Sequence, residues 1–166
     1  MTDSANLIAF QGEPGANSDT ACRDMFPEME PLPCPTFEDA FNAVESGKAR
    51  LAMIPIENTI AGRVADIHYL LPDSRLHIIG EYFLPVRHQL MAVKGATLAT
   101  IRTVQSHVQA LGQCRRTLRK LNLMPVVGAD TAGSARQIAE LADPTRAAIA
   151  PQLAAEVYGL EILAAD

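Results

Sequence analysis

The chain has 166 residues, of which 48% are hydrophobic and 20% are charged, and its formal net charge is −5. This length and apolar content suffice for a buried core, so we expect one globular domain or one deeply divided domain. The acidic balance argues against nucleic acid as a partner, because binding to phosphates needs a basic surface.

The sequence also argues against a membrane or a metal ion as a partner. Its apolar runs are shorter than the roughly 18 residues of a membrane span, and its opening stretch MTDSANLIAF lacks the basic start of a secretory signal. The three cysteines are widely spaced, without a CxxC motif, which is typical of reduced thiols. We therefore expect a cytoplasmic protein without a bound metal.

Strands and helices alternate along the first half of the chain. The pattern predicts a strand over residues 7–10, helices over 19–25 and from 36 to 47, a strand over 51–56, and a helix over 63–71 that Pro72 ends. Thr36 and Asp39 have the spacing of a capping box, which supports a helix start at Thr36.

The alternation resumes in the second half after an extended stretch over residues 76–93. The pattern predicts strands over 101–104, 125–128, 146–150 and 160–163, and helices that begin at Ser106, after ADTAGS and at Pro151. Ser106 and Gln109 form a second capping box at the start of a long helix.

This rhythm is typical of the α/β class with a mostly parallel sheet. The extended stretch interrupts the rhythm, and we interpret it as a passage between two lobes. We therefore predict a first lobe over 1–80, an interlobe passage over 81–93 and a second lobe over 94–166.

Polar residues gather where predicted strands run into helices, in the segments QGEPGANS, ENTIAG, SHVQ and DTAGS. Ligands of open α/β sheets bind beyond the carboxyl ends of the strands, where helix N-termini bind carboxylates without a lysine or arginine. The alternative interpretation is a helix cap or a turn at each position, and an exposed first-turn side chain for His107. The repetition favours a shared cleft for a small anion.

Several of these motifs resemble the catalytic domain of prephenate dehydratase. AFQGEPGANSDTA, PIEN with a following hydroxyl residue, RHQLMAV, SHVQALGQC and DTAGSARQIAE stand in the family's order and spacing, over nearly the whole chain. The resemblance implies two α/β lobes similar to a type II periplasmic binding protein, with a cleft between them. It also implies conversion of prephenate to phenylpyruvate, water and carbon dioxide on the route to phenylalanine, with no cofactor.

The resemblance also implies which residues form the site. It gives catalytic roles to Thr59 and His107. The substrate-binding residues that it implies are Gly15, Asn58, Thr59, Ser106, Gln109, Thr131, Gly133 and Ser134. We expect Glu57 to orient its neighbours, because a bare carboxylate would repel a dianionic substrate.

Two departures from the family pattern affect the expected activity. Thr59 stands where the family commonly has serine, and this change keeps the hydroxyl. The family's Thr-Arg-Phe motif, which holds its main candidate acid, and its phenylalanine-sensing ACT domain are missing; Thr145-Arg146 comes too early to replace the motif. We therefore expect a truncated chain, a homo-oligomer in the full-length protein, and phenylalanine as an effector only through the ACT domain.

Two alternatives without chemistry remain at this stage. One is a cytoplasmic binding module of the periplasmic-binding-protein type for a carboxylate or an amino acid. The other is a structural fragment that contributes to an oligomer. Production of phenylpyruvate from prephenate would separate an enzyme from both.

Overall fold

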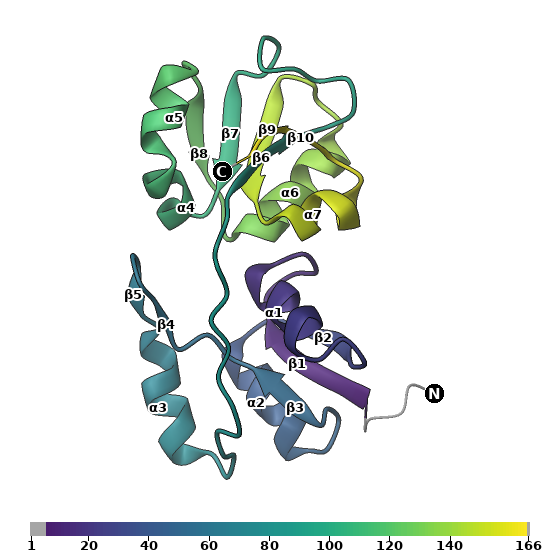
Figure 1. The fold of residues 1–166 in the computed structure, drawn as a ribbon, viewed down its shortest axis with the longest axis vertical. Helices are drawn as coiled ribbons and strands as arrows, with labels where there is room; N and C mark the ends of the chain where they lie inside the picture. The colour runs from purple at the N-terminus through teal and green to yellow at the C-terminus, as the bar shows by residue number, and fades with distance from the viewer. Residues whose placement is uncertain (1–5, 166) are drawn as a thin grey trace. The chain divides into compact units, whose positions relative to one another are not determined.

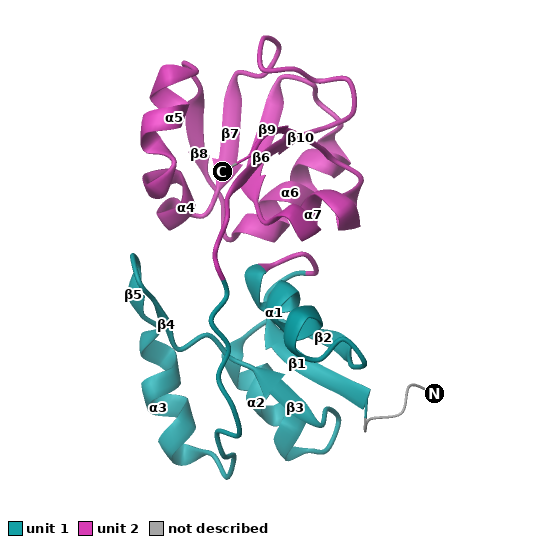
Figure 2. Cartoon of the chain, viewed as in Figure 1, with its two compact units in different colours: residues 1–13, 17–84 teal, residues 14–16, 85–166 magenta. Residues whose placement is uncertain are grey.

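The computed structural model describes residues 6–165, which divide into two compact units. Unit 1 contains the described residues up to Glu13 together with Asn17–Leu84, and unit 2 contains Pro14–Ala16 and the described residues from Pro85 onward (Figure 2). Both units contain helices and strands, which confirms the expected α/β class. Within the described part, no helix is long and apolar enough to cross a membrane.

A three-stranded parallel sheet in the order β2–β1–β3 forms the centre of unit 1 (Figure 1). Its strands are β1 (Leu7–Gln11), β2 (Glu30–Cys34) and β3 (Leu51–Met53), and the helices of this unit are α1 (Asn17–Met25), α2 (Phe37–Glu45) and α3 (Ala65–Asp73). Ala9 of β1 packs in one core cluster with Ala40 and Ala43 of α2. Because side chains alternate along a strand, the fully buried Ile8 and Phe10 point to the opposite face of the sheet.

Local signals in unit 1 explain both the correct predictions and the misses. Thr36 is the N-cap of α2 and accepts a hydrogen bond from the Asp39 N–H at 3.1 Å, as predicted. Strand β2 was not predicted, because Pro31 and Pro33 are disfavoured in strands. It lies at the edge of the sheet, which is the position where proline is tolerated. The prediction that Pro72 ends its helix is wrong, because Pro72 lies inside the last turn of α3.

A mixed five-stranded sheet in the order β10–β6–β9–β7–β8 forms the centre of unit 2 (Figure 1). Its strands are β6 (Gln89–Ala92), β7 (Thr103–Ser106), β8 (Met124–Val127), β9 (Arg146–Ala150) and β10 (Glu161–Ala164). Strands β8, β7 and β9 are parallel, whereas β6 is antiparallel to both β9 and β10. The expectation of a mostly parallel sheet therefore holds for unit 1 only. Strand β6 lies within the segment predicted as the interlobe passage, and it is fully buried.

Helices cover both faces of this sheet. They are α4 (Val108–Gln113), α5 (Arg115–Lys120), α6 (Thr131–Leu141) and α7 (Gln152–Tyr158). Ala147 and Ile149 of β9 pack in a cluster with α4 and α5, while Ala148 and Ala150 pack in a second cluster with α6 and α7. This alternation fixes the register of β9, because a shift by one residue would exchange the two faces.

The long helix predicted from Ser106 is in fact two short helices separated at Cys114. Gly112 lies two residues before the break and has a low helix propensity. The apolar positions continue through both helices, because Leu111 and Leu118 pack in the same cluster. Periodicity alone therefore did not reveal the interruption.

Candidate functional site

The carboxyl ends of three parallel strands meet at one edge of the unit 2 sheet. β7, β8 and β9 end at Ser106, Val127 and Ala150, and each strand leads into a helix. The Gly128 N–H donates to the Ser106 carbonyl at 2.8 Å, which joins the ends of β7 and β8. Ligands of open α/β sheets bind at this kind of edge.

Ser106 is a fully buried residue that ties β7 to β9 at this edge. Its Oγ donates to the Ile149 carbonyl oxygen at 2.6 Å. The capping box predicted from Ser106 is wrong, because Ser106 is the last residue of β7 and the N-cap of α4 is His107. The hydroxyl proton of Ser106 is used within the protein, so direct contact with substrate stays a prediction.

His107 caps α4 through its ring. Its Nδ1 accepts a hydrogen bond from the Gln109 backbone N–H at 3.3 Å. A ring nitrogen that accepts carries no proton, so in the neutral imidazole the proton lies on Nε2. His107 is half-buried and the Gln109 side chain is exposed. The pair therefore offers two neutral donors, the His107 Nε2–H and the Gln109 amide.

The first turn of α6 is held by Asp130, which the sequence analysis did not single out. Its Oδ1 accepts from the Gly133 N–H at 2.6 Å, and its carbonyl accepts from Ser134 Oγ at 2.6 Å. Asp130 is therefore the N-cap, and Thr131 is the first helical residue. The preference for aspartate at N-caps was the signal that could have identified it.

Two glycines at this edge are required for space. A Cβ on Gly133 would lie 2.6 Å from Asp130 Oδ2, inside the N-cap itself. A Cβ on Gly128 would meet Ser134 Oγ and the Gln105 side chain. Gly133 and the buried Ser134 thus build the turn, and Thr131, which is half-buried, is the residue of this motif left to offer a hydroxyl.

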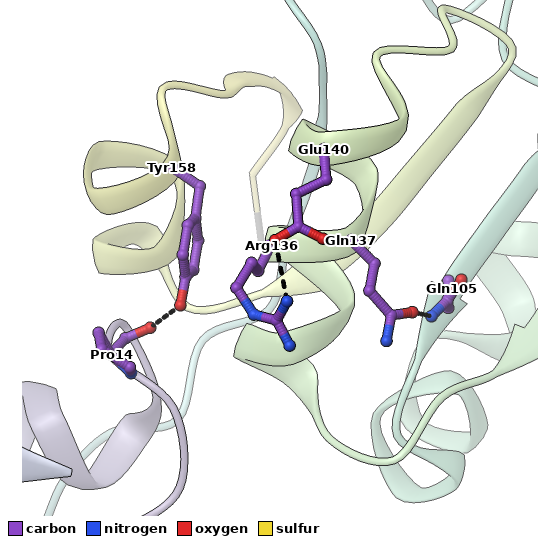
Figure 3. A network of polar contacts seen from close by, with 6 residues as sticks. All are labelled: Pro14, Gln105, Arg136, Gln137, Glu140 and Tyr158. Atoms are coloured by element: carbon purple, nitrogen blue, oxygen red, sulfur yellow. Dashed lines mark hydrogen bonds and ion pairs between the residues drawn. The ribbon is translucent and has the colours of Figure 1, made fainter.

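Gln105 and Gln137 form a side-chain bridge between β7 and α6. Gln105 Nε2 donates to Gln137 Oε1 at 2.5 Å (Figure 3). Neither residue was predicted, because isolated glutamines carry no local pattern. Their bond joins the middle of α6 to the third residue of β7.

Gly15 is the middle residue of the segment Pro14–Ala16, which belongs to unit 2 although Glu13 and Asn17 on either side of it belong to unit 1. It is buried, its φ is +86°, and a Cβ at this position would lie 2.8 Å from Ala154 Cα. The glycine is therefore explained by close packing against α7. The contact of Gly15 with substrate stays a prediction.

Asn58 and Thr59 lie in unit 1, in a hairpin of β4 (Glu57–Asn58) and β5 (Gly62–Arg63). Asn58 Oδ1 accepts from the Ile60 and Ala61 N–H groups, each at 2.9 Å. The sequence analysis predicted that ENTIAG leads from a strand into a helix starting at residue 63, and it did not predict a hairpin. This Asx-type turn closes a hairpin instead, and the helix starts only at Ala65.

The hairpin leaves two predicted functional groups exposed. Glu57 and Thr59 are both exposed to solvent, and Asn58 is half-buried. The Asn58 carboxamide oxygen is used in the turn, and its NH₂ group can still donate. The roles of these three residues toward substrate stay predictions.

Thr145 was not assigned the acid role of the family's Thr-Arg-Phe motif. In the structure it forms a turn with Asp143. Its Oγ1 and its N–H both donate to Asp143 Oδ1, at 2.7 and 2.9 Å. These hydrogen bonds, the one from the hydroxyl first, hold the pKa of the Asp143 carboxyl below its usual value. The turn that they form precedes β9.

His88 directly precedes β6, whose first residue, Gln89, pairs with Ala150 at the carboxyl end of β9. Its Nε2 hydrogen-bonds Gln113 Oε1 at 2.8 Å, and its Nδ1 is buried without a hydrogen-bond partner. It lines a hollow of about 90 Å³ with Leu90, Cys114 and Ile149, among others. Across residues 6–165, no group of three or more His, Cys, Asp or Glu side chains could hold a metal ion.

Comparisons with known proteins point to one family. The family model described as prephenate dehydratase matches residues 8–166. The bifunctional N-acyl-homoserine lactone acylase/prephenate dehydratase of Komagataeibacter europaeus is 49% identical over 157 residues, which are 95% of this chain and 56% of that protein. Arogenate dehydratase 1 of Petunia hybrida is 45% identical over 166 residues, which are 99% of this chain and 39% of that protein.

Two solved structures share the fold closely. GqqA, a quorum quenching acylase, superposes with a TM-score of 0.92 at 48% identity, over 96% of this chain and 58% of that chain. The prephenate dehydratase of Arthrobacter aurescens in complex with L-Phe superposes with a TM-score of 0.88 at 31% identity, over 96% of this chain and 55% of that chain. The present chain thus spans about half the length of the relatives it matches.

Proposed function

Because the chain belongs to the prephenate dehydratase family, we propose that it binds prephenate and supports its conversion to phenylpyruvate, water and carbon dioxide. The family implies dehydratase chemistry, which is that of a lyase. Prephenate as the specific substrate, and a place in phenylalanine biosynthesis, are our proposals.

The reaction needs few groups from the protein. The bond between the ring and its carboxylate breaks, and the electron pair enters the ring as the hydroxyl leaves from the opposite carbon. The hydroxyl takes up a proton and departs as water, and the ring becomes aromatic. The protein must therefore hold two carboxylates and supply one proton donor, which is typically worth about 10²–10⁴-fold in rate.

The observation that carries this proposal is the meeting of β7 and β8 at one sheet edge, which brings His107, Gln109 and Thr131 into one part of unit 2. These side chains offer neutral donors. A neutral site suits a carboxylate that must leave as carbon dioxide, because a strong cation would stabilise the ground state more than the transition state.

His107 is the proton donor that we propose in this chain. Its Nδ1 accepts from the Gln109 N–H, so its Nε2–H is the group able to donate toward the leaving hydroxyl. Thr59 is the second candidate, and Asn58 is a candidate for binding a carboxylate. The roles of these two residues rest on the family resemblance.

A spectroscopic assay tests the proposal. Prephenate is added to the 166-residue chain and to a chimera that joins it to the remaining portion of the Komagataeibacter relative, and phenylpyruvate absorbance is followed. We expect the chimera to turn over prephenate and the isolated chain to bind it. Binding by both proteins with turnover by neither would instead favour a carboxylate-binding module.

Arogenate is the second substrate for this assay, because relatives at 42–46% identity are named arogenate dehydratases. It carries an amino group where prephenate has a keto group, so its product is phenylalanine. We expect a higher kcat/KM for prephenate, because the described donors of unit 2 at the sheet edge are neutral. The opposite preference would overturn the substrate that we propose.

Acylase activity is a second candidate function, supported by the name of the 49%-identical relative. Amide hydrolysis needs an activated nucleophile, yet Ser106 and Ser134 each donate their hydroxyl proton to a backbone carbonyl. We therefore propose the dehydratase first. Release of homoserine lactone from an N-acyl-homoserine lactone tests the second candidate with the same two proteins.

We further propose that the protein acts as a homo-oligomer in the cytoplasm, and that phenylalanine regulates it through an additional domain. The Arthrobacter relative was solved with L-Phe, which supports a phenylalanine effector in this family. Size-exclusion chromatography with and without phenylalanine would test both proposals about assembly and regulation.

A further inference from the structure

A three-residue segment from the first half of the chain is built into unit 2. Pro14–Ala16 lies in sequence between β1 and α1, both of unit 1, but it belongs to unit 2. The Tyr158 hydroxyl donates to the Pro14 carbonyl at 2.8 Å, across 144 positions of sequence (Figure 3). The Tyr158 side chain in Figure 3 extends from the end of α7 directly to Pro14.

Two further contacts fix the same segment. Gly15 is packed so closely on Ala154 that a Cβ would lie 2.8 Å from Ala154 Cα. Ala154 and Tyr158 are four residues apart in α7, so both lie on one face of that helix. The segment therefore follows a single face of α7 from Ala154 to Tyr158.

The anchored segment also packs against the core cluster that α6 and α7 share. Ala16 packs against the cluster that contains Ala132 and Ala135 of α6 together with Ala154 of α7. Ala132 directly follows Thr131, the first residue of α6 and a proposed substrate-binding residue. The core cluster on which the segment packs thus includes the residue next to Thr131.

We propose that Tyr158 is a positioning residue of the substrate site, which holds Pro14–Ala16 against α7 and so supports the first turn of α6. The role in substrate binding rests on the proposed function. Tyr158 acts through the segment and takes no part in proton transfer, so its loss weakens substrate binding and leaves the chemical step intact.

The substitution Tyr158→Phe tests this role, because it removes only the hydroxyl. One neutral hydrogen bond contributes a factor of roughly three to ten to an equilibrium. We expect hydrogen exchange at the Gly15, Ala16 and Asn17 amides to rise by about that factor in the 166-residue chain. In the active chimera, KM for prephenate should rise about three- to tenfold while kcat stays unchanged.

Tyr69→Phe is the matched control. Tyr69 lies in α3 of unit 1 and is 76% exposed, so its hydroxyl should affect neither readout. Unchanged exchange in Tyr158→Phe would overturn the anchor. Faster exchange with unchanged KM, or with a fall in kcat, would overturn the positioning role. A wild-type protein that neither binds nor converts prephenate would overturn the proposed function, and the exchange data would still report on the anchor.

Discussion

Two of the candidate site residues use a side-chain atom to hold their own backbone. Asn58 Oδ1 accepts the N–H groups of Ile60 and Ala61, and His107 Nδ1 accepts that of Gln109. Each side chain keeps a second group, the Asn58 NH₂ or the His107 Nε2–H, that can face a ligand. A substitution that keeps the hydrogen bond to the backbone and removes the group facing a ligand can therefore separate the structural role of the residue from its role in the site.

Asn58→Asp keeps an acceptor for the turn and replaces the donor by a negative charge. Two like charges about 4 Å apart repel by about 1 kcal/mol even in bulk water, so we expect KM for prephenate to rise roughly fivefold or more. Steady-state kinetics on the active chimera measures this change. The Ile60 and Ala61 amides should stay protected from hydrogen exchange, and an unchanged KM would remove Asn58 from the site.

His107→Asn keeps a good N-cap, because asparagine ranks among the best residues at that position. It removes the ring, so we expect kcat to fall by about 10²-fold if the ring donates the proton. Urea unfolding should give a free energy within about 0.5 kcal/mol of wild type. His107→Ala is the comparison, since it should lose the cap as well as the activity. Wild-type turnover in His107→Asn would show that His107 only caps α4.

At the scale of the elements, side-chain bonds join the ends of strands to each other and to the helices that follow. Ser106 joins β7 to β9, Gln105 joins β7 to Gln137 of α6, and Asp130 closes the first turn of α6. These bonds hold the backbone at the sheet edge in place before any ligand arrives. Preorganisation of this kind lowers the free-energy cost of binding.

Ser106→Ala removes the hydrogen bond from Ser106 Oγ to the Ile149 carbonyl, which is buried. The loss of a buried hydrogen bond costs about 1–3 kcal/mol, so the free energy of unfolding should fall by that amount in urea titrations. Ser46→Ala is the matched control, because Ser46 Oγ makes a bond of the same kind, to the Asn42 carbonyl, at an exposed position. Equal losses in the two variants would contradict the structural role of Ser106.

The elements also show where sequence reasoning succeeded. Strand β9 was predicted with its observed bounds, because Arg146 is followed by the continuous apolar run AAIA, which is buried on both faces. The Thr36 cap of α2 was predicted from a purely local pattern. The hairpin at Asn58 was missed, because ENTIAG was interpreted as leading from a strand into a helix. The Asp130 cap was missed, because the neighbouring Thr131 is also a good N-cap residue.

At the scale of the whole molecule, membership of the family was accessible from motifs and two lobes were predicted from the sequence, whereas the placement of Pro14–Ala16 in unit 2 was not. The exchange of Pro14–Ala16 into unit 2 depends on Tyr158 and Ala154, which lie about 140 residues away in sequence. The antiparallel placement of β6 and β10 likewise depends on long-range pairing. No local window carries either signal.

The stability of the whole chain should decline at alkaline pH because of Cys22. Burial, followed by the charge of Asp19, raises the pKa of the Cys22 thiol from 9.0 to about 12. The folded state therefore holds this proton more tightly than the unfolded state. The resulting stabilisation is complete below pH 9 and is lost as the pH rises through about 12.

Urea unfolding across this alkaline range measures the effect. We expect the free energy of unfolding to fall less steeply with rising pH in Cys22→Ala than in wild type. In Cys114→Ala it should fall as steeply as in wild type. Burial also raises the pKa of the Cys34 thiol, and the hydrogen bond to Asp24 raises that of the Tyr82 hydroxyl, so part of the decline should remain in Cys22→Ala. Identical slopes in wild type and Cys22→Ala would contradict the role of Cys22.

The order of strands in unit 2 has a consequence for synthesis on the ribosome. β6 is the first strand of this sheet to be translated, yet its two neighbours, β9 and β10, are the last. At roughly 5–20 residues per second, a nascent chain carries the apolar segment Gln89–Ala92 unpaired for several seconds before its partners emerge. Chaperone dependence during translation should therefore centre on β6.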